Sequence, residues 1–266
     1  MAFPDTPRVI YSRNPLAEVV AYLRFPPILR IDSETPAAFQ DAIRADYPRY
    51  SEGSLKVPLP PNLPPQFMNF VQGMSTGRAS GMKHQFASQD EKWQIILTRE
   101  MLELKTTAYI RWEDFRTRLA QLTVALQAVY RPAAFARIGL RYVNVIQRSV
   151  LNLDETPWSV LLKPYIAGEL SAPELAEGID SVSHQLHCRL DDGGNSFLAL
   201  KTGIAFAEPK KEKCFLIDAD IHTHNQTESS DALNVLDSFN RISGRFFRWC
   251  IEQPLLNALE PQPVQD

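Results

Sequence analysis

The segment from Cys214 to His224, CFLIDADIHTH, combines residue types that can bind a metal ion. Successive side chains of an extended strand point to opposite faces, so Asp218, Asp220, His222 and His224 share one face. A strand rises ~3.3 Å per residue, which separates Asp218 from His224 by about 20 Å, whereas ligands lie about 2 Å from one metal ion. At most two neighbouring side chains of this strand could therefore share an ion.

The pair His222 and His224, with Asp220 as a further ligand or as a base, is the metal site that this strand could form. It would hold zinc or manganese and would support hydrolysis. A third ligand must come from another strand. The nearest other histidines, His184 and His187, lie on opposite faces of their own strand. In a meander that strand would lie two places away from the DADIHTH strand. We therefore favour a solvated strand end over a metal site, and we expect no cofactor.

A second candidate is the segment RIGLRYVN, residues 137–144. Arginine grips carboxylate or phosphate through paired N–H donors, and Gly139 between two arginines would let a ligand approach the backbone. The alternative, which we favour, is an ion-pair network between the two halves of the chain, such as Glu18 with Arg141. The candidate ligand-binding residues lie on this strand and on the equivalent strand of the first half: Arg137, Arg141, Tyr142, Asn144, Glu18, Tyr22 and Arg24.

Other groups favour structural roles. Glu113 and Asp114 read as the acidic first turn of a helix, where negative charge complements the helix dipole. No Ser, Cys or Thr lies in a nucleophile motif such as GxSxG. Three widely spaced cysteines indicate buried thiols rather than a disulfide framework or a metal knuckle.

Composition limits the class of protein. The chain has 266 residues, which suits one large domain or two small ones, and 44% of them are hydrophobic. The formal net charge of −3 argues against high nonspecific affinity for nucleic acid, although a saddle-shaped sheet could still lie on a duplex. The first residues lack the order of a secretory signal, and no apolar run approaches a membrane span. We expect a soluble, cytoplasmic protein.

The first half contains one complete set of elements. A strand is expected at 15–25, followed by a short helix with Thr35 as its N-cap and Pro36 as its first residue. Residues 51–82 are rich in Pro, Gly and Ser and should form a long loop. An apolar stripe predicts a helix over about 112–130. Three strands should precede that helix: MKHQFASQ, KWQIILTRE and MLELKTTAYI.

The second half repeats this order. A strand is expected at 136–147, then a short helix with Thr156 as its cap. A long helix should begin near Ser229 or Ser230 and end before Pro254. Three strands should lie between the two helices: SVSHQLHCRL, SFLALKTGIAF and CFLIDADIHTH.

The order β-α-β-β-β-α thus occurs twice and predicts an α+β fold. The halves, 1–133 and 134–266, should form antiparallel sheet or sheets covered by long amphipathic helices. An ancestral tandem duplication would explain the repeat; the alternative is a single α+β domain with coincidental symmetry. The chain lacks a Gly-rich phosphate loop and short βαβ alternation, which disfavours a doubly wound nucleotide-binding fold.

Four segments carry a family resemblance: NPLAEVVAYLRFPPILRIDSETPAAFQDAIRADYPRY, TAYIRWEDFRTRL, RIGLRYVNVI and FLIDADI. Together they resemble a sporadically distributed bacterial protein family of similar length with no assigned function, and RIGLRYVN is the most distinctive piece. The resemblance covers most of the chain and implies a bacterial, single-chain soluble protein, but it assigns no role to any residue. His222 and His224 depart from the Asp-x-Asp and apolar pattern of that family.

Two functions follow as hypotheses. We favour a non-enzymatic binding or accessory protein of a bacterial cytoplasm. It would engage a partner protein or a small anionic ligand through a sheet face or through the 51–82 loop, because loops this long are usually functional or disordered. The alternative is a metal-dependent hydrolase that uses the DADIHTH strand. The sequence does not indicate the oligomeric state.

Overall fold

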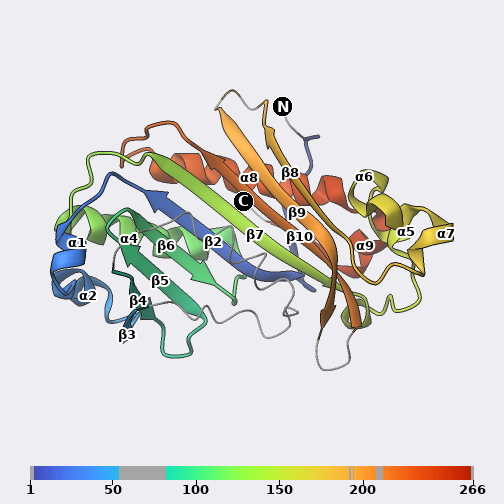
Figure 1. Ribbon diagram of the computed structural model, residues 1–266, viewed down its shortest axis with the longest axis horizontal. Helices are drawn as coiled ribbons and strands as arrows, with labels where there is room; N and C mark the ends of the chain where they lie inside the picture. Colours follow the sequence, from blue (N-terminus) through green and yellow to red (C-terminus); the bar gives the residue numbers. More distant parts are fainter. Residues whose placement is uncertain (1–2, 54–81, 192, 194, 208–211, 265–266) are drawn as a thin grey trace.

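The fold is α+β, as the sequence predicts. A nine-stranded antiparallel sheet forms the centre of the molecule, and a separate two-stranded sheet joins segments near the two ends of the chain (Figure 1). This computed structural model describes residues 3–53, 82–191, 193, 195–207 and 212–264.

The elements of the first half are β1 (Val9–Tyr11), β2 (Leu16–Arg24), α1 (Arg30–Ser33), α2 (Ala37–Ile43), β3 (Arg49–Glu52), β4 (His84–Ala87), β5 (Trp93–Thr98), β6 (Met101–Thr106) and α4 (Trp112–Val129). Those of the second half are β7 (Arg137–Gln147), η1 (Ser149–Leu151), α5 (Trp158–Leu161), α6 (Pro164–Ala167), η2 (Gly168–Ser171), α7 (Pro173–Ala176), β8 (Ser183–Arg189), β9 (Ser196–Ala207), β10 (Glu212–Thr223), α8 (Ala232–Cys250), α9 (Gln253–Ala258) and β11 (Pro261–Pro263).

The strand order of the large sheet is mirrored about its centre. It runs β3-β4-β5-β6-β2-β7-β10-β9-β8, so β2 and β7 pair at the middle and three strands of each half follow outward. Apart from β1, β3, α9 and β11, which are additional, the strands and the long helix of each half follow the predicted β-α-β-β-β-α order, and more than one short helix replaces the single short helix expected in each half. The two halves share one sheet. An ancestral duplication, which would account for the mirrored order, stays a prediction.

The two long helices cover one face of this sheet (Figure 1). On α4, Phe115, Leu119 and Leu122 recur at helical spacing and are buried, and the Phe115 ring lies 5.8 Å from the Trp93 ring of β5. Helix α8 packs on β7 and β10. Both helices contribute to a continuous apolar core with the inward-facing residues of the strands. Burial of these stripes stabilises the helices on the sheet.

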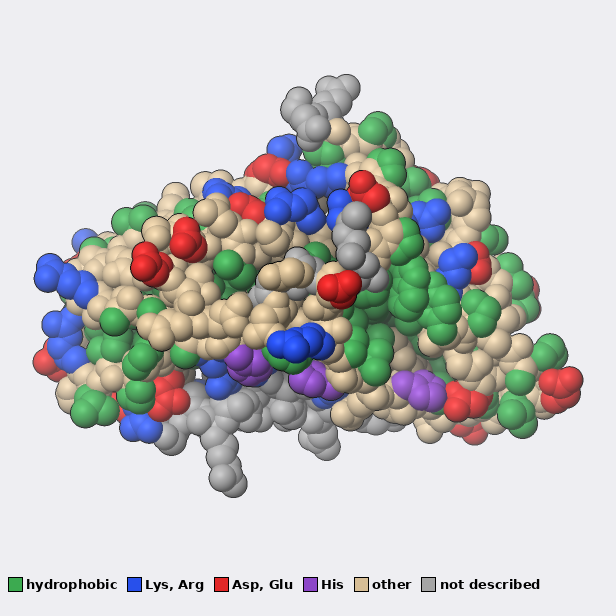
Figure 2. All heavy atoms as spheres, turned by 90° about the horizontal axis from the view of Figure 1, so that it is seen from above, with side chains coloured by type: hydrophobic (Ala, Val, Ile, Leu, Met, Phe, Trp, Pro, Cys, Tyr) green, Lys and Arg blue, Asp and Glu red, His purple; other side chains and the backbone are tan. Residues whose placement is uncertain are grey.

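The opposite face of the sheet is polar, and its side chains are nevertheless buried. Arg141 of β7 forms a bidentate pair with Asp218 of β10, with both N–O distances at 2.7 Å. Lys105 of β6 lies 3.6 Å from Glu18 of β2. Neither long helix of the described residues packs on this face, and we call it the helix-free face. In Figure 2, histidine side chains lie along the lower margin of the molecule, whereas a group of Lys and Arg side chains lies in the upper half.

Most element boundaries agree with the sequence analysis, and the helix starts are the exceptions. The helix expected to begin at Pro36 begins at Ala37, with Pro36 at the N-cap and no capping side chain, so Thr35 is not the cap. The second short helix likewise has Pro157 rather than Thr156 at its N-cap. Residues 51 and 52 belong to β3 and are not loop. The rest of the predicted 51–82 loop lies almost entirely outside the described residues.

Within the part of the chain that the structure describes, no helix is both long enough and apolar enough to cross a membrane.

Gly139 is required by a close approach on the helix-free face. The ring of Tyr22 lies across it, and a Cβ at position 139 would come within 2.2 Å of that ring. This position lets the Tyr22 hydroxyl donate to the carboxylate of Asp220, 3.0 Å away, and accept from Nε of Arg137. The space that the sequence analysis offered to a ligand is therefore filled by a side chain of the protein.

We predict that Gly139→Ala destabilises the fold by about 1–3 kcal/mol, because the Tyr22 ring must move and lose its bonds to Asp220 and Arg137. Gly244, in the middle of α8, is the matched control. A Cβ there meets no atom within 4 Å, so Gly244→Ala should stabilise the protein by roughly 0.5–1 kcal/mol through helix propensity. Urea unfolding of both variants measures the two effects. Equal unfolding free energies for the two variants would contradict the requirement for glycine beside the Tyr22 ring.

Candidate functional site

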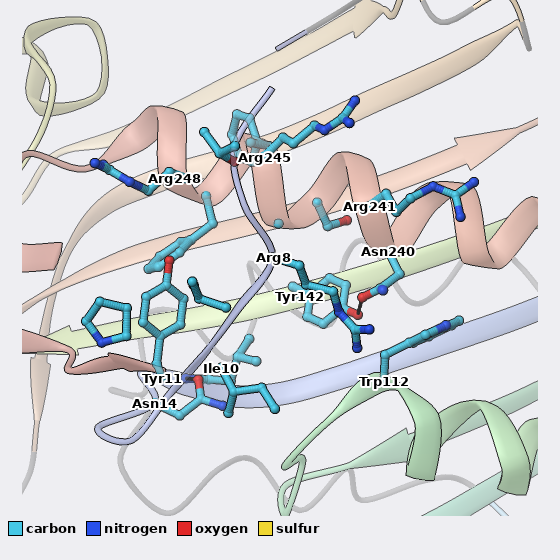
Figure 3. A pocket seen from close by; sticks show the side chains of 18 of the residues that line it. Arg8, Ile10, Tyr11, Asn14, Trp112, Tyr142, Asn240, Arg241, Arg245 and Arg248 are labelled. Carbon is cyan, nitrogen blue, oxygen red and sulfur yellow. Dashed lines mark hydrogen bonds between the residues drawn. The ribbon is translucent and has the colours of Figure 1, made fainter. Parts of the chain in front are cut away.

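A cavity with largely apolar walls lies on the helix-covered side of the molecule, beneath the N-terminal segment (Figure 3). We call residues 5–14 the strap. The strap crosses over β7 and α8 and closes a half-open pocket of about 540 Å³. The turn from Tyr109 to Trp112 and the C-terminal residues Leu256 and Pro261 complete its walls. We call this space the strap pocket.

Pairing near the two ends of the chain holds the strap in place. Strand β1 pairs antiparallel with β11, and the backbone N–H of Ser12 donates to the carbonyl of Glu260. The Tyr11 ring meets the edge of Phe247 on α8 at 5.6 Å. Phe3 packs its ring on Phe246 at 5.1 Å. The position of the strap thus depends on contacts between residues about 250 positions apart in the sequence.

Three ion pairs add to this attachment. Arg8 lies 2.6 Å from Glu113 at the start of α4, and Asp5 lies 2.5 Å from Arg245 of α8. Arg13 pairs with Glu260 at 3.0 Å. Such partly exposed pairs each contribute little to stability, so the strap is held mainly by its backbone pairing and its aromatic contacts.

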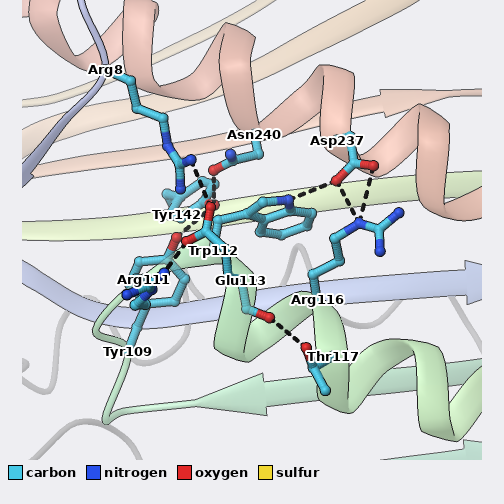
Figure 4. A network of polar contacts seen from close by, with 10 residues as sticks. All are labelled: Arg8, Tyr109, Arg111, Trp112, Glu113, Arg116, Thr117, Tyr142, Asp237 and Asn240. Atoms are coloured by element: carbon cyan, nitrogen blue, oxygen red, sulfur yellow. Dashed lines mark hydrogen bonds and ion pairs between the residues drawn. The ribbon is translucent and has the colours of Figure 1, made fainter. Parts of the chain in front are cut away.

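The pocket walls are largely apolar and aromatic. The Tyr109 and Tyr142 rings meet edge to face at 5.7 Å, and Trp112 lies beside them (Figure 4). Burial raises the pKa of Tyr109 to about 12, so its hydroxyl is neutral and can donate at physiological pH. The aromatic side chains that line the pocket are Tyr11, Tyr109, Trp112, Tyr142, Phe246 and Phe247.

The pocket has a positive lining. Its lining residues include five arginines, and no carboxylate occurs among those that the structure describes. Two of these arginines, Arg241 and Arg248, contact neutral oxygens: the Ser238 hydroxyl for the first, and the Ile251 carbonyl and Gln253 amide for the second. The complete set is Arg8, Arg111, Arg241, Arg245 and Arg248. This concentration of positive charge stands out because the whole chain carries a formal charge of −3.

One corner of the pocket gathers hydrogen-bond donors (Figure 4). The Tyr142 hydroxyl donates to Oδ1 of Asn240 at 2.9 Å, which leaves the Asn240 NH₂ group without a partner among the described residues. The guanidinium of Arg8 points toward this corner, and Arg111 lies across from it. Glu113 bridges the two arginines, at 2.6 Å from Arg8 and 3.2 Å from Arg111. We call this group the polar corner.

Glu113 remains ionised under ordinary conditions. Its hydrogen bond from Arg8 is the main cause that lowers the pKa of its carboxyl to about 2, and Arg111 acts in the same direction. The bridge therefore neutralises one of two positive charges in the corner and leaves a net positive charge.

The ligand-binding residues predicted from the sequence do not come together. Of the seven, Tyr142 and Asn144 line the strap pocket. The other five lie on the helix-free face, since β7 alternates its side chains between the two faces. Arg24 and Arg137 occupy paired positions there, and Tyr22 lies across Gly139.

The favoured alternative for these residues, an ion-pair network between the two halves, is not what they form: each of their ion pairs lies within one half of the chain. Arg141 binds Asp218, and Glu18 binds Lys105, so the two residues expected to pair with each other each pair elsewhere. Arg137 lies 3.6 Å from Asp220. Because two of its nitrogens bond Asp218, the guanidinium of Arg141 is not open to a ligand.

The histidines of the DADIHTH strand lie close together on the helix-free face. The His222 and His224 rings are 5.2 Å apart, and His187 of β8 lies 5.6 Å from His222, on the same face. His184 lies on the other face, as the sequence predicts, and its Nε2 is 2.9 Å from a carboxylate oxygen of Glu169. Within the described ranges, however, no group of three or more His, Cys, Asp or Glu side chains is arranged to hold a metal ion.

Burial sets the protonation of two groups in this cluster. It lowers the pKa of His222 to about 3, with Arg137 acting in the same direction. It raises the pKa of Asp220 to about 6, against the opposing effect of the arginines. Nδ1 of His222 is 3.6 Å from Asp220 and has no hydrogen-bond partner within the described part of the chain. His222 is therefore neutral at physiological pH.

No protein-family model matches the chain, and no curated protein matches it either. The family resemblance drawn from the sequence stays a prediction.

The strap pocket was not found from the sequence. Its strap comes from the first residues of the chain, which carry no motif. One signal was present: Arg241, Arg245 and Arg248 follow one another at helical spacing on α8, with Gly244 among them. Three arginines on one side of an otherwise packed helix indicate a positive edge, but they do not reveal the cavity beside it.

We predict that the attachment of the strap weakens in acid. The pKa of Glu113 is lower in the folded state than its ordinary value of 4.5, so its ion pairs stabilise the fold above pH 4.5. This contribution is lost as the pH falls toward 2. The difference in unfolding free energy between the wild-type protein and Glu113→Gln should therefore shrink from pH 5 to pH 2. Denaturant unfolding at several pH values measures it, and a difference independent of pH would contradict the role of this carboxylate.

Proposed function

We propose that this protein binds a small organic anion with an aromatic or aliphatic body in the strap pocket. The observation that carries the proposal is the lining of the pocket: five arginines and six aromatic side chains surround about 540 Å³, and no carboxylate is among the described lining residues. Ligand pockets in proteins measure ~300–1,000 Å³ and are mostly apolar, with a few polar groups that orient the ligand.

The polar corner supports recognition of the anionic group. Arg8 and Arg111 supply guanidinium donors, whose planar geometry suits carboxylate and phosphate oxygens. The NH₂ group of Asn240, which no described residue engages, supplies a neutral donor beside them. Because Glu113 already neutralises one arginine, a single negative charge on the ligand would balance the corner.

The other end of the pocket supports recognition of an apolar body. Tyr11 and Arg248 lie there, away from Arg8 and Trp112 (Figure 3), and the Phe247 ring is 5.6 Å from the Tyr11 ring. Burial of apolar ligand surface contributes about 25 cal/mol per Å², and arginines at the rim can also stack on an aromatic ring. A simple inorganic anion would leave these walls uncovered.

Binding fits the pocket better than catalysis does. Its described lining residues include no His, Cys, Asp, Glu or Lys. Ser243 and three tyrosines line it, but a serine or tyrosine nucleophile needs an adjacent base, and none of those residue types supplies one among the described lining residues. The proposal keeps the non-enzymatic binding protein favoured from the sequence and moves its ligand from the helix-free face to the opposite side of the sheet. The metal-dependent hydrolase and the bacterial cytoplasmic setting stay predictions from the sequence.

Three probes test the proposal: 1-naphthoate, the neutral 1-naphthalenemethanol and acetate. They separate the charge of the ligand from its body. We expect 1-naphthoate to bind in isothermal titration calorimetry, the neutral analogue to bind at least tenfold more weakly, and acetate to show no measurable binding. A charge-assisted hydrogen bond contributes about 1.5–3 kcal/mol, and 1.4 kcal/mol corresponds to tenfold in affinity.

Variants locate the site. Arg8→Ala should weaken binding of 1-naphthoate at least tenfold, and Arg44→Ala, at an exposed arginine of the first half, should leave it unchanged. Gly244→Leu should place a bulky side chain among the pocket arginines and weaken binding at least tenfold, whereas Gly244→Ala should retain it. Loss of binding in Arg137→Ala but not in Arg8→Ala would move the site to the helix-free face. Equal affinity for the charged and the neutral probe would overturn the proposal.

A further inference from the structure

Strand β8 forms one edge of the large sheet and is exposed along its length. It pairs with β9 on one side, in seven consecutive residue pairs without a register shift. Six of its seven residues are exposed, and Leu186 at its centre is 52% exposed. No other described strand pairs with its outer side.

This edge lacks the features that usually prevent pairing with another chain. Natural edge strands are commonly short, bulged, covered, or interrupted by Lys or Pro. The sequence of β8, SHQLHCR, contains neither Lys nor Pro, and its one formally charged residue is Arg189 at the end. A regular edge of seven residues is long enough to bind a further strand.

The direction of the free backbone groups follows from the bonds to β9. The carbonyl of Val182 accepts from the N–H of Ile204, and the N–H of Leu190 donates to the carbonyl of Ser196. In an antiparallel pair the bonded residues alternate, so the even-numbered residues of β8 bond to β9. The N–H and C=O groups of the odd-numbered residues, from 183 to 189, therefore point to the open edge.

We propose that β8 pairs with β8 of a second copy of this chain, antiparallel and centred on Leu186. In this register Gln185 lies opposite His187 of the second copy, and Ser183 lies opposite Arg189. All four positions are odd-numbered, so each can exchange two backbone hydrogen bonds with its partner. The nine-stranded sheets of the two copies would continue into one another.

The side chains of β8 are complementary to themselves in this register. The two Leu186 side chains meet on the two-fold axis in a non-hydrogen-bonded pair, where Cα atoms are ~4.5 Å apart and side chains are closest. His184 lies opposite Cys188 of the second copy. Arg189 faces the uncharged Ser183, so no like charges are opposed. An unrelated partner strand would need to match this pattern, whereas a second copy matches it by symmetry.

The interface is small, since it consists mainly of one strand from each copy. Interfaces below ~1,200 Å² are typical of weak, reversible association. The dimer should therefore depend on concentration. It is independent of the strap pocket, because no residue of β8 lines that pocket.

Sedimentation velocity of the full chain between 1 and 200 µM tests the proposal. We expect a reversible shift from monomer to dimer. Gln185→Pro removes an N–H that the monomer does not use, and Pro is tolerated at such an edge position, so it should raise the dissociation constant at least tenfold without unfolding the protein. Leu186→Lys places two positive charges on the axis and should do the same. Val124→Lys, at an apolar residue of α4 that is 69% exposed, is the matched control and should leave dimerisation unchanged.

A cross-link tests the register. His184→Cys places a thiol opposite the native Cys188 of the second copy, within the Cα separation of about 4.4–6.8 Å that a disulfide requires. Treatment with diamide should produce a dimer in which mass spectrometry finds positions 184 and 188 linked between chains. A monomer at every concentration would overturn the proposal, as would a dimer unaffected by Gln185→Pro and Leu186→Lys. Random linkage among the thiols would overturn the register.

Discussion

The alternation of side chains along β7 is the constraint on which both faces of the molecule depend. Arg141 points to the helix-free face, whereas Tyr142 and Asn144 point toward the helices and line the strap pocket. Burying Arg141 is tolerable because Asp218 satisfies it with two hydrogen bonds; removal of either partner would leave a buried charge and cost about 3–5 kcal/mol. An arginine held in this way is not available to a ligand. The central arginine of the RIGLRYVN segment therefore stabilises the sheet, and its neighbours Tyr142 and Asn144 contribute to the wall of the strap pocket.

The fold could be predicted from the sequence because its signals are local. The strand expected at 136–147 and the helix expected at 112–130 are present with almost the predicted bounds, since apolar residues recur there with the strand and helix periods. The mirrored order of the large sheet follows from two similar runs of elements. The starts of the two short helices were predicted wrongly. Thr35 and Thr156 are good capping residues, but the following prolines occupy the N-cap positions instead. Pro fixes its own backbone angle, and the two starts fall one residue later than the capping rule predicts.

The site could not be predicted because it is built from contacts that are distant in the sequence. The strap reaches its place through the pairing of β1 with β11, and neither three-residue strand has a recognisable periodic pattern. Tyr142 and Asn144 were identified, but as members of a sheet-face site with Arg137 and Arg141. Similarly, His187 was expected to be too far from His222, since two strand spacings amount to ~9.6 Å between backbones. Their side chains shorten this separation to 5.6 Å between rings, which backbone spacing alone does not show.

Gly244 links the stability of α8 to the strap pocket. It lies in the interior of a 19-residue helix, where glycine costs about 1 kcal/mol relative to alanine. Close packing does not require it, because a Cβ at this position meets no atom within 4 Å. The space that a side chain would occupy is part of the pocket, between the arginines at positions 241 and 248. A helix that keeps glycine where a larger residue would fit and would stabilise it preserves empty volume beside a row of cations, as a helix that borders a binding site would.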